Sequence, residues 1–266
     1  MRGAGMLVSV VTPTLNSARW MHECCASVLM QQAEGVEVQH VVADGGSTDD
    51  TVAIAESYGA TLAPRDPADD LETVINKATL FSSGQLVGFL GSDDVLLPGG
   101  LSALVRRYQE SGCRWVIGGY YWMDAHLRPI GRVAPPPTYL PAQFQAALGW
   151  LYISHQATYM ERSLFEELGG FDPGFVASGD YDFFMRAMAI APYAAEPQAV
   201  TGYRRHGSNW SAVRTEAIEE GAEVVRRYAP SEPWKRSLYR YGMKAYVNAR
   251  NPVWSYRKFR PLPPAE

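Results

Sequence analysis

The sequence predicts an α/β fold, with a mostly parallel sheet that carries helices on both faces and a helical tail at the C-terminus. Two observations lead to this prediction. Short apolar runs alternate with helical patterns between residues 7 and 97, and this alternation is typical of βαβ units. The apolar runs also end in polar or glycine-containing turns, so that strand, turn and helix recur in the same order.

The first strand is predicted to begin at Leu7 and to stop near Pro13, because proline cannot donate a hydrogen bond to a neighbouring strand. A helix over residues 21–31 follows. The second strand is expected over residues 36–43, where valine recurs. The chain therefore begins with a strand, a helix and a second strand.

The turn after the second strand has the sequence Asp44-Gly-Gly-Ser-Thr-Asp-Asp-Thr51. Its glycines allow the backbone to approach a neighbouring group closely. Ser47 with Asp50 matches the capping pattern of a following helix. We therefore expect a polar turn that leads directly into a helix.

A short third run at residues 61–63 precedes a predicted helix over 71–83 and a strand over 85–90. This strand delivers the adjacent carboxylates Asp93 and Asp94 into a turn before the next helix. Ligands of open α/β sheets bind at the carboxyl ends of the strands, and oxygen ligands there suit Mg²⁺ or Mn²⁺. The alternative is that the pair only caps the next helix.

Length and composition agree with one enzyme-sized globular domain plus a tail. The chain has 266 residues, of which 47% are hydrophobic and 20% charged, enough to bury a substantial core. A net charge of −4 argues against general nucleic-acid binding. Three cysteines make a poor disulfide framework, and no signal peptide or apolar run of membrane-spanning length is present. We therefore expect a cytoplasmic location.

Residues 233–264 contain no acid and combine basic with aromatic side chains. Such a helix can lie on an anionic membrane surface, which would place the protein at the inner face of the membrane. The alternative is a helix that packs its tyrosines on the domain and turns its arginines to water. The basic residues are Lys235, Arg236, Arg240, Lys244, Arg250, Arg257, Lys258 and Arg260.

Seven motifs follow one another between residues 6 and 211. They are Ser9-Val-Val-Thr-Pro-Thr-Leu-Asn16, Asp44-Gly-Gly-Ser-Thr-Asp49, Asn76-Lys77, Gly91-Ser-Asp-Asp94, Gly169-Gly-Phe-Asp-Pro-Gly-Phe175, Gly179-Asp-Tyr-Asp-Phe-Phe-Met-Arg186 and Tyr203-Arg-Arg-His-Gly-Ser-Asn-Trp-Ser211. In this order the set resembles the inverting glycosyltransferases of family two, which have the GT-A fold. Together with the motif that begins at Asp44, His155-Gln-Ala157 is similar to a subgroup that assembles exopolysaccharides and glycolipids.

The resemblance implies a GT-A-like, Rossmann-type domain. Its nucleotide-sugar-binding half is expected over residues 1–120 and its acceptor-binding half over 121–215, with a basic, aromatic helical tail over 216–266. A nucleoside-diphosphate sugar is the implied donor, and Mn²⁺ or Mg²⁺ the implied metal. The residues expected at the donor are Thr12, Asn16, Asp44, Asn76, Lys77, Ser92 and Asp93.

Some of these donor residues also have structural interpretations. Asp44 and Asn16 are both typical turn residues, and Lys77 fits a solvated surface charge equally well. With the family, Asp44 would contact the nucleotide. Without it, a turn aspartate is as good an interpretation.

Asp93 and His206 are the implied metal ligands. A divalent cation neutralises the charge that develops on a leaving diphosphate, and a neutral histidine can ligate Mn²⁺. The alternative for His206 is a surface histidine beside Arg204 and Arg205, two arginines that could themselves bind the diphosphate through forked hydrogen bonds.

Asp180 is the implied general base. It opens a predicted helix over residues 181–191, where backbone amides favour an ionised carboxylate that can accept a proton. The alternative is that Asp180 only caps this helix, which Ser178 could also do. Asp182 is expected to be structural and to pair with Arg186, four residues further on.

The chain departs from the family pattern at two glycines. Gly91 stands where the first carboxylate of an Asp-x-Asp motif is usual, and Gly179 stands where a glutamate often precedes the catalytic aspartate. These departures leave Asp93 and Asp180 to carry their roles alone.

The sequence thus predicts a metal-dependent inverting glycosyltransferase that moves a sugar to a hydroxyl of a glycan, a glycolipid or another glycoside. One alternative is a polyprenyl-phosphate sugar transferase, and another is a catalytically silent nucleotide-sugar-binding module, with which Gly91 and Gly179 are compatible. A sugar nucleotidyltransferase would need a glycine-rich basic loop after the first strand, and Thr12-Pro-Thr-Leu-Asn16 is not one.

Overall fold

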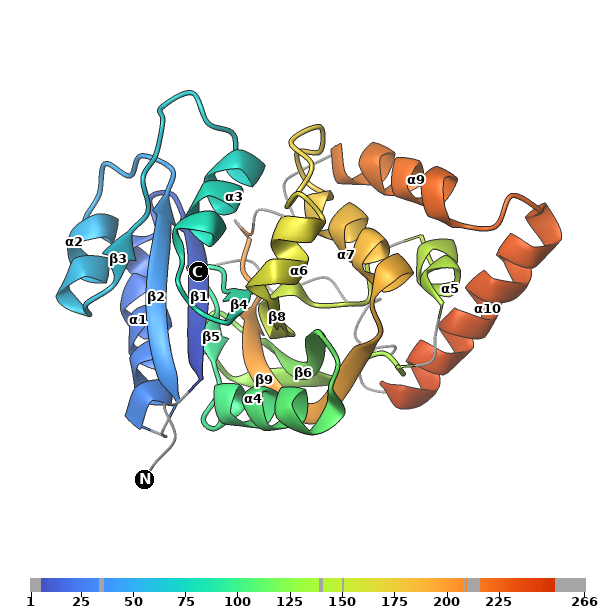
Figure 1. The fold of residues 1–266 in the computed structure, drawn as a ribbon, viewed down its shortest axis with the longest axis horizontal. Coiled ribbons are helices and arrows are strands. Elements are labelled where there is room, and N and C mark those ends of the chain that lie inside the picture. The colour runs from blue at the N-terminus through green and yellow to red at the C-terminus, as the bar shows by residue number, and fades with distance from the viewer. Residues whose placement is uncertain are drawn as a thin grey trace.

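The computed structural model describes residues 6–33, 36–138, 141–149, 151–207, 209 and 216–251. In this part of the chain nine strands form one sheet in the order β3-β2-β1-β4-β8-β6-β9-β5, with β7 paired to β6. Helices lie on both faces of the sheet (Figure 1). The predicted α/β fold is confirmed.

The first half of the sheet is parallel, as predicted. Strands β1 (Leu7–Thr14), β2 (Glu37–Asp44), β3 (Thr61–Leu62) and β4 (Leu86–Phe89) pair side by side in the same direction. The helices α1 (Ala18–Ala33), α2 (Thr51–Ser57) and α3 (Leu71–Phe81) connect them. Asp70 caps α3 by accepting a hydrogen bond of 2.8 Å from the backbone amide of Thr73.

The second half of the sheet is mixed, which the sequence prediction of a mostly parallel sheet missed. Here β6 and β9 run parallel, while the pairs β4–β8, β6–β8, β6–β7 and β5–β9 are antiparallel. The expected boundary between the two halves at residue 120 lies inside β6, so one sheet continues through both. The strands are β5 (Val95–Leu96), β6 (Trp115–Met123), β7 (Pro129–Val133), β8 (Thr158–Glu161) and β9 (Tyr193–Arg204).

The remaining helices have clear local causes at several ends. Gly99 and Gly112 flank α4 with φ of 70° and 66°, a left-handed conformation that favours glycine. Pro233 begins α10, where its missing amide costs no helical hydrogen bond. The elements are α4 (Gly100–Ser111), α5 (Ala142–Ala147), the 3₁₀ helix η1 (His155–Ala157), α6 (Arg162–Glu167), α7 (Gly179–Ile190), α9 (Glu216–Tyr228) and α10 (Pro233–Arg250).

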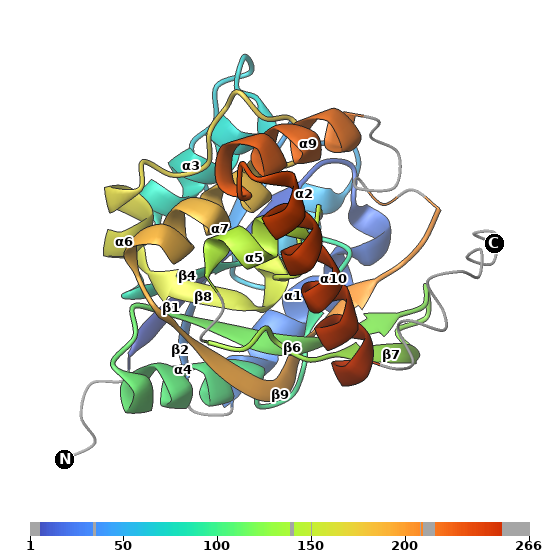
Figure 2. The same cartoon turned by 90° about the vertical axis from the view of Figure 1, so that its right-hand side faces the viewer.

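Two apolar layers hold the helices on the sheet. Leu101 and Leu104 of α4 pack with Val10 of β1 and with α1 on one face, and Phe165 of α6 packs with Phe183 of α7 and with α3 on the other. Viewed from the side, α10 runs beside α5 and across the end of the sheet formed by β6 and β7 (Figure 2). The predicted helical tail is therefore confirmed over α9 and α10, and residues 252–266 lie outside the described part.

The parallel strands bring three polar loops to one edge. Thr14 pairs with Asp44, and Val11 pairs with Phe89, so β1, β2 and β4 end together. Asp44 is the last residue of β2, and the loops that follow β1 and β4 carry Asn16 and Asp93. This common edge is where ligands of such sheets bind.

The predicted capping pair of Ser47 and Asp50 was wrong. Asp50 is the N-cap of α2 but makes no side-chain capping bond. The Ser47 hydroxyl donates to Asp44 Oδ1 instead, at 2.6 Å.

Among the described helices, none is long and apolar enough to cross a membrane.

Candidate active site

Asp93 and His206 face each other at the carboxyl edge of the sheet. Asp93 Oδ2 lies 2.9 Å from His206 Nε2, although the two residues are 113 positions apart in the chain. The His206 side chain is 6% exposed and that of Asp93 25% exposed, so the pair lies at the boundary between the interior and solvent. The structure therefore brings together the two residues that were expected to bind the metal.

Neighbouring side chains orient this pair. Asn209 Nδ2 donates to Asp93 Oδ2 at 3.0 Å, and Asn209 Oδ1 accepts the backbone amide of His206 at 2.6 Å. The His206 ring stacks on Trp20 of α1 with its centroid 5.0 Å away. A buried imidazole with a fixed ring plane is a well-prepared metal ligand.

Arg204 places a buried cation against Trp20, the ring on which His206 also stacks. Its guanidinium lies 4.4 Å from the centre of the Trp20 ring, and its side chain is 1% exposed. Within the described residues, Nε and Nη2 make no hydrogen bond, and Nη2 is 3.6 Å from Glu23 Oε2. A buried guanidinium with free donors is suited to an anionic group such as a phosphate.

Asp94 has a structural part in this arrangement. Its Oδ1 accepts the backbone amide of Arg204 at 2.8 Å, and its Oδ2 accepts Gln156 Nε2 at 2.9 Å. It is 1% exposed, and burial together with the charge of Asp93 holds its pKa well above the usual range. Asp94 therefore ties β9 and η1 to the loop that carries Asp93.

The side chain of Asp44 binds the backbone of the loop that follows it. Its carboxylate accepts the backbone amides of Gly46 and Ser47 at 2.9 and 3.0 Å. Asn16 has a backbone φ of 49°, and its Oδ1 accepts a hydrogen bond of 2.9 Å from the backbone amide of Thr48. This bond connects the loop after β1 to the loop after β2. Asp44 and Asn16 therefore stabilise turns, as their structural interpretations predicted. Both residues also lie at the edge of the sheet where a donor would bind.

Ser92 lies next to Asp93 and joins the site to α1. Its hydroxyl donates to the hydroxyl of Ser17 at 2.9 Å, just before that helix begins. The expected donor residues thus lie at or just after the ends of three strands: Asp44 is the last residue of β2, and Asn16, Ser92 and Asp93 follow β1 and β4.

Three other expected donor residues have different partners. Thr12 is fully buried, with its hydroxyl 2.9 Å from His40 Nε2, because its side chain points between the strand and α1 rather than along the edge. Both amide atoms of Asn76 bond the backbone of Phe171 at 2.8 Å. Lys77 pairs with Asp69 on the surface at 2.6 Å. These three side chains thus have partners within the protein, and their contact with a donor stays a prediction.

Asp180 is the second residue of α7 and lies near η1. Its Oδ1 accepts the amide of Tyr181 at 2.7 Å, and its Oδ2 is 3.4 Å from His155 Nδ1. The side chains of Asp180 and His155 are 32% and 34% exposed, so both can reach a ligand. Ser178, the N-cap of α7, makes no side-chain capping bond.

Asp182 is structural, as predicted. It is 1% exposed and accepts bonds of 2.7 Å from Arg186 Nε and 2.8 Å from the Tyr228 hydroxyl. These contacts hold α7 against α9. Asp182 is thereby turned away from the solvent-accessible side that Asp180 occupies.

At both glycines that depart from the family pattern, nearby carboxylates occupy the space that a side chain would take. A β-carbon on Gly91 would lie 2.8 Å from both Asp93 Oδ1 and Asp94 Oδ2. A β-carbon on Gly179 would lie 3.0 Å from Oε1 of Glu72, which comes from α3. Sequence reasoning missed Glu72, because a glutamate in the first turn of a helix is ordinary. The signal in the sequence that could have pointed to Glu72 is Gly179, the glycine that stands where the family often has a glutamate.

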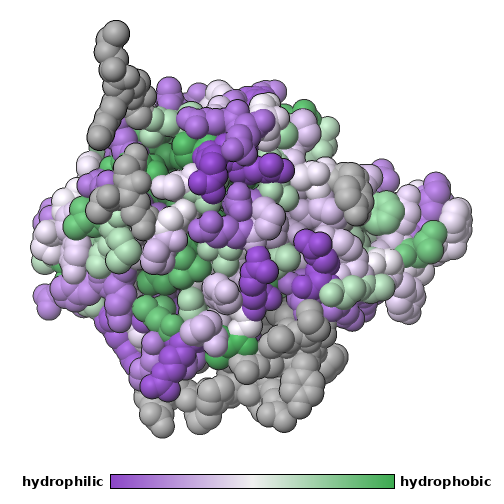
Figure 3. All heavy atoms as spheres, turned by 90° about the horizontal axis from the view of Figure 1, so that it is seen from below, coloured by the Kyte–Doolittle hydropathy of each residue, from purple (hydrophilic) through white to green (hydrophobic). Residues whose placement is uncertain are grey.

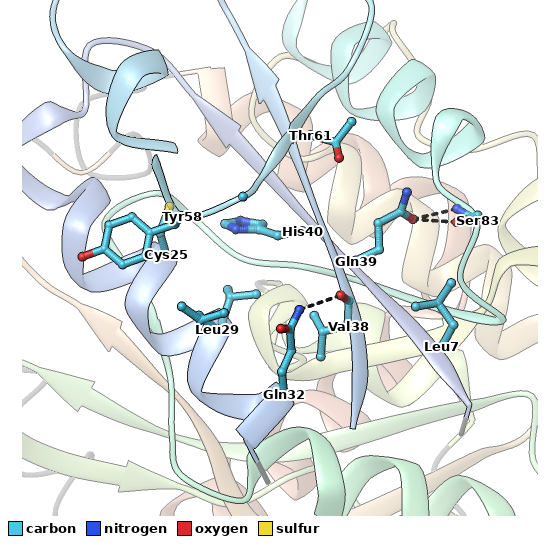
Figure 4. Close-up of a pocket in the computed structure, with 12 residues that line it drawn as sticks. Leu7, Cys25, Leu29, Gln32, Val38, Gln39, His40, Tyr58, Thr61 and Ser83 are labelled. Atoms are coloured by element: carbon cyan, nitrogen blue, oxygen red, sulfur yellow. Dashed lines mark hydrogen bonds between the residues drawn. The ribbon is translucent and has the colours of Figure 1, made fainter. Parts of the chain in front are cut away.

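A separate cavity of about 300 Å³ lies between α1, β2 and the segment before β3 (Figure 4). Gln39, His40 and Tyr58 are among its lining residues, and burial lowers the pKa of His40 to about 4. None of the described residues that line it is an expected site residue. The cavity is therefore distinct from the edge that carries Asp93.

Comparison with known proteins agrees with this geometry. Residues 9–169, more than half of the chain, match the family model described as glycosyl transferase family 2. The uncharacterized glycosyltransferase MT1564 of Mycobacterium tuberculosis (strain CDC 1551 / Oshkosh) is 30% identical over 186 residues, which cover 69% of this chain and 69% of that protein.

Two solved structures have a similar fold. S. aureus TarS 1-349 in complex with UDP-GlcNAc superimposes with a TM-score of 0.67 at 18% identity, covering 97% of this chain and 77% of that one. Glucosyl-3-phosphoglycerate synthase from Mycobacterium tuberculosis, in complex with Mn²⁺, UDP and glucosyl-3-phosphoglycerate, gives a TM-score of 0.59 at 20% identity, covering 85% and 82%. At these identities the likeness shows the fold.

Proposed function

This chain belongs to glycosyl transferase family 2 and is a glycosyltransferase, and from that premise we propose that it transfers a sugar, with inversion, from a nucleoside-diphosphate sugar to a hydroxyl acceptor. The observation that carries the proposal is the convergence of Asp93 and His206 at the strand edge, 2.9 Å apart. That edge also holds the loops of Asn16 and Asp44, which would receive the nucleotide.

The donor set fits a divalent cation such as Mn²⁺ or Mg²⁺. Asp93 Oδ2 and His206 Nε2, 2.9 Å apart, are a carboxylate oxygen and an imidazole nitrogen of the kinds that such an ion accepts, and they would hold it. The structurally similar synthase was solved with Mn²⁺ and UDP. When bound, the ion would neutralise charge on the leaving diphosphate.

Arg204 is proposed to assist the leaving group. Two nitrogens of its guanidinium have no hydrogen bond among the described residues, and they lie in a buried setting against Trp20, where an electrostatic contact is stronger than in water. The backbone of Arg204 is held by Asp94, so the guanidinium starts from a fixed position.

Asp180 is proposed to take the proton of the acceptor hydroxyl. Its carboxylate is exposed enough to reach a substrate, and the backbone amide of Tyr181 orients it by donating to Oδ1 at 2.7 Å. His155 Nδ1, 3.4 Å from Asp180 Oδ2, would help to hold that carboxylate toward the acceptor.

A donor panel tests this function. We expect the protein to hydrolyse at least one nucleoside-diphosphate sugar slowly without acceptor and to release the nucleoside diphosphate faster when Mn²⁺ is added. Chromatography of UDP-, GDP- and dTDP-sugars after incubation measures this. A nucleotide-binding module would leave every donor intact, and a nucleotidyltransferase would release a sugar phosphate instead.

We further propose that α10 contacts the membrane surface peripherally. Trp234, Leu238 and Tyr241 recur on one side of the helix and are 65%, 60% and 70% exposed, while Met243 and Val247 are buried. Arg240 and Lys244 are exposed close to this stripe. Seen from below, hydrophobic and hydrophilic side chains lie together at the end of the molecule that α10 forms, on the right (Figure 3). This combination suits anionic lipid headgroups.

Liposome binding tests this contact. A variant with Trp234→Ser, Leu238→Ser and Tyr241→Ser is expected to lose sedimentation with phosphatidylglycerol liposomes at low salt, because it loses the inserted side chains. Donor hydrolysis should be unchanged. Ile218→Ser, an exposed change on α9, is the matched control and should still sediment. A wild type that ignores these liposomes at low salt would end the membrane proposal.

A further inference from the structure

Glu72 is a buried carboxylate that the proposed reaction does not yet use. It lies in the first turn of α3 and is 7% exposed. Its Oε1 is 3.0 Å from the position of a β-carbon on Gly179, and its Cγ is 3.1 Å from the same point. Glu72 therefore occupies the space of a side chain at position 179, directly beside Asp180.

Among the described residues Glu72 forms no ion pair, and its own backbone amide donates a hydrogen bond to its carboxylate. The charged groups that act on it most strongly are Asp70 of its own helix N-cap, Asp180 of α7 and Glu220 of α9, and all three are acids. Glu220 is itself held by the backbone amides of Val176 and Ala177 at 2.7 and 2.8 Å. Burial first, and then these neighbouring charges, raise the pKa of Glu72 to about 7.

We propose that Glu72 is the second carboxylate of the acceptor site, and that it accepts a hydrogen bond from a hydroxyl of a neutral, polyhydroxylated acceptor while Asp180 takes the proton of the attacking hydroxyl. This inference rests on the proposed function and narrows its acceptor class. A buried carboxylate that has only one backbone amide and no cation beside it is costly, and a hydroxyl donor from a ligand would reduce that cost.

The same acids exclude an anionic acceptor. A phosphate monoester, as in a polyprenyl phosphate, would have to approach Glu72 and Asp180 with Glu220 and Asp70 behind them. Like charges in a partly desolvated site repel strongly, whereas a sugar hydroxyl donates to a carboxylate without penalty. The site thus discriminates between the two acceptor classes that the sequence left open.

The Glu72→Gln variant tests the role directly, with p-nitrophenyl glycosides as neutral acceptor probes. It keeps the shape of the side chain but removes its charge, so the KM for acceptor is expected to rise roughly ten- to hundredfold. In the wild type the acceptor KM should fall as Glu72 ionises, between about pH 6 and about pH 8, and this pH dependence should disappear in the variant.

A second test moves the carboxylate from position 72 to position 179. Gly179→Glu alone should impair transfer, because its side chain meets Glu72. Combined with Glu72→Ala, the new glutamate can fill the vacated space, and transfer should recover relative to Glu72→Ala alone. Recovery would show that a carboxylate is needed at this place, whichever chain segment supplies it.

Thermal stability separates function from a purely structural role. Because folding raises the pKa of Glu72, the folded state binds its proton more tightly and loses stability as pH rises from about 4.5 to about 7. Glu72→Gln lacks this loss and should melt at a higher temperature than the wild type at pH 8, but not at pH 5. Glu220→Gln, whose carboxylate holds backbone amides, should melt lower at both.

Donor hydrolysis by the wild type separates failure of this inference from failure of the proposed function. If no donor is hydrolysed, the proposed function fails, whatever Glu72 does. If donor is hydrolysed, the inference is overturned by an unchanged acceptor KM in Glu72→Gln, by a melting temperature of that variant below the wild type at pH 8, or by wild-type transfer to farnesyl phosphate.

Discussion

The Asp180→Asn variant is expected to transfer sugar roughly 10²- to 10⁴-fold more slowly than the wild type, with nearly constant affinity for the donor. Asparagine keeps the size of the side chain, and its oxygen can still accept the amide of Tyr181, now 2.7 Å away. It cannot accept the proton of a hydroxyl. Steady-state transfer rates and calorimetric donor affinity, measured on the same preparations, check the prediction.

Asp182→Asn is the matched control, two residues away on the same helix. Asp182 bonds Arg186 and Tyr228 in the interior, so the change should cost roughly 1–3 kcal/mol of unfolding free energy and leave the transfer rate of the folded protein almost intact. Should Asp182→Asn be the inactive variant, or Asp180→Asn transfer at the wild-type rate, the assignment of the base is wrong.

Asp93→Ala is expected to abolish the effect of Mn²⁺ on donor binding. The change removes one of the two facing ligands and leaves His206 alone, stacked on Trp20. A single imidazole holds a divalent cation weakly, so the affinity for UDP or GDP should no longer respond to the metal. Calorimetry of nucleotide binding with and without Mn²⁺ measures this, and circular dichroism confirms that the fold is retained.

Asp94→Ala should behave differently at the neighbouring position. Asp94 bonds the backbone of Arg204 and the side chain of Gln156, so its loss should lower the melting temperature. A weaker but still metal-dependent affinity is expected. Wild-type nucleotide affinity that is the same with and without Mn²⁺ would contradict the proposed metal site.

Several features followed from the sequence because their causes are local. The i to i+4 spacing of Asp182 and Arg186 predicts a pair on any helix, and the structure has it at 2.7 Å. The turn character of Asp44 lies in residues next to it, and its carboxylate indeed binds the amides of Gly46 and Ser47. The parallel first half of the sheet follows from alternating apolar and helical runs.

The directions of the later strands could not be read in the same way. An apolar run predicts a strand but carries no sign of which neighbour it pairs with or in which direction. Here β8 enters between β4 and β6 and runs against both. Likewise, a strand residue predicted to face a ligand can face a helix instead, as Thr12 does beside His40.

The sequence by itself determined the α/β class, the order of the motifs and the family, since these depend on residue types and their spacing along the chain. Only the tertiary structure decided which distant side chains meet. It set Asp93 against His206, and it placed Glu72 of α3 in the space beside Gly179 of α7. Such contacts arise from the packing of whole elements, and a glycine shows only that space is available, not which side chain fills it.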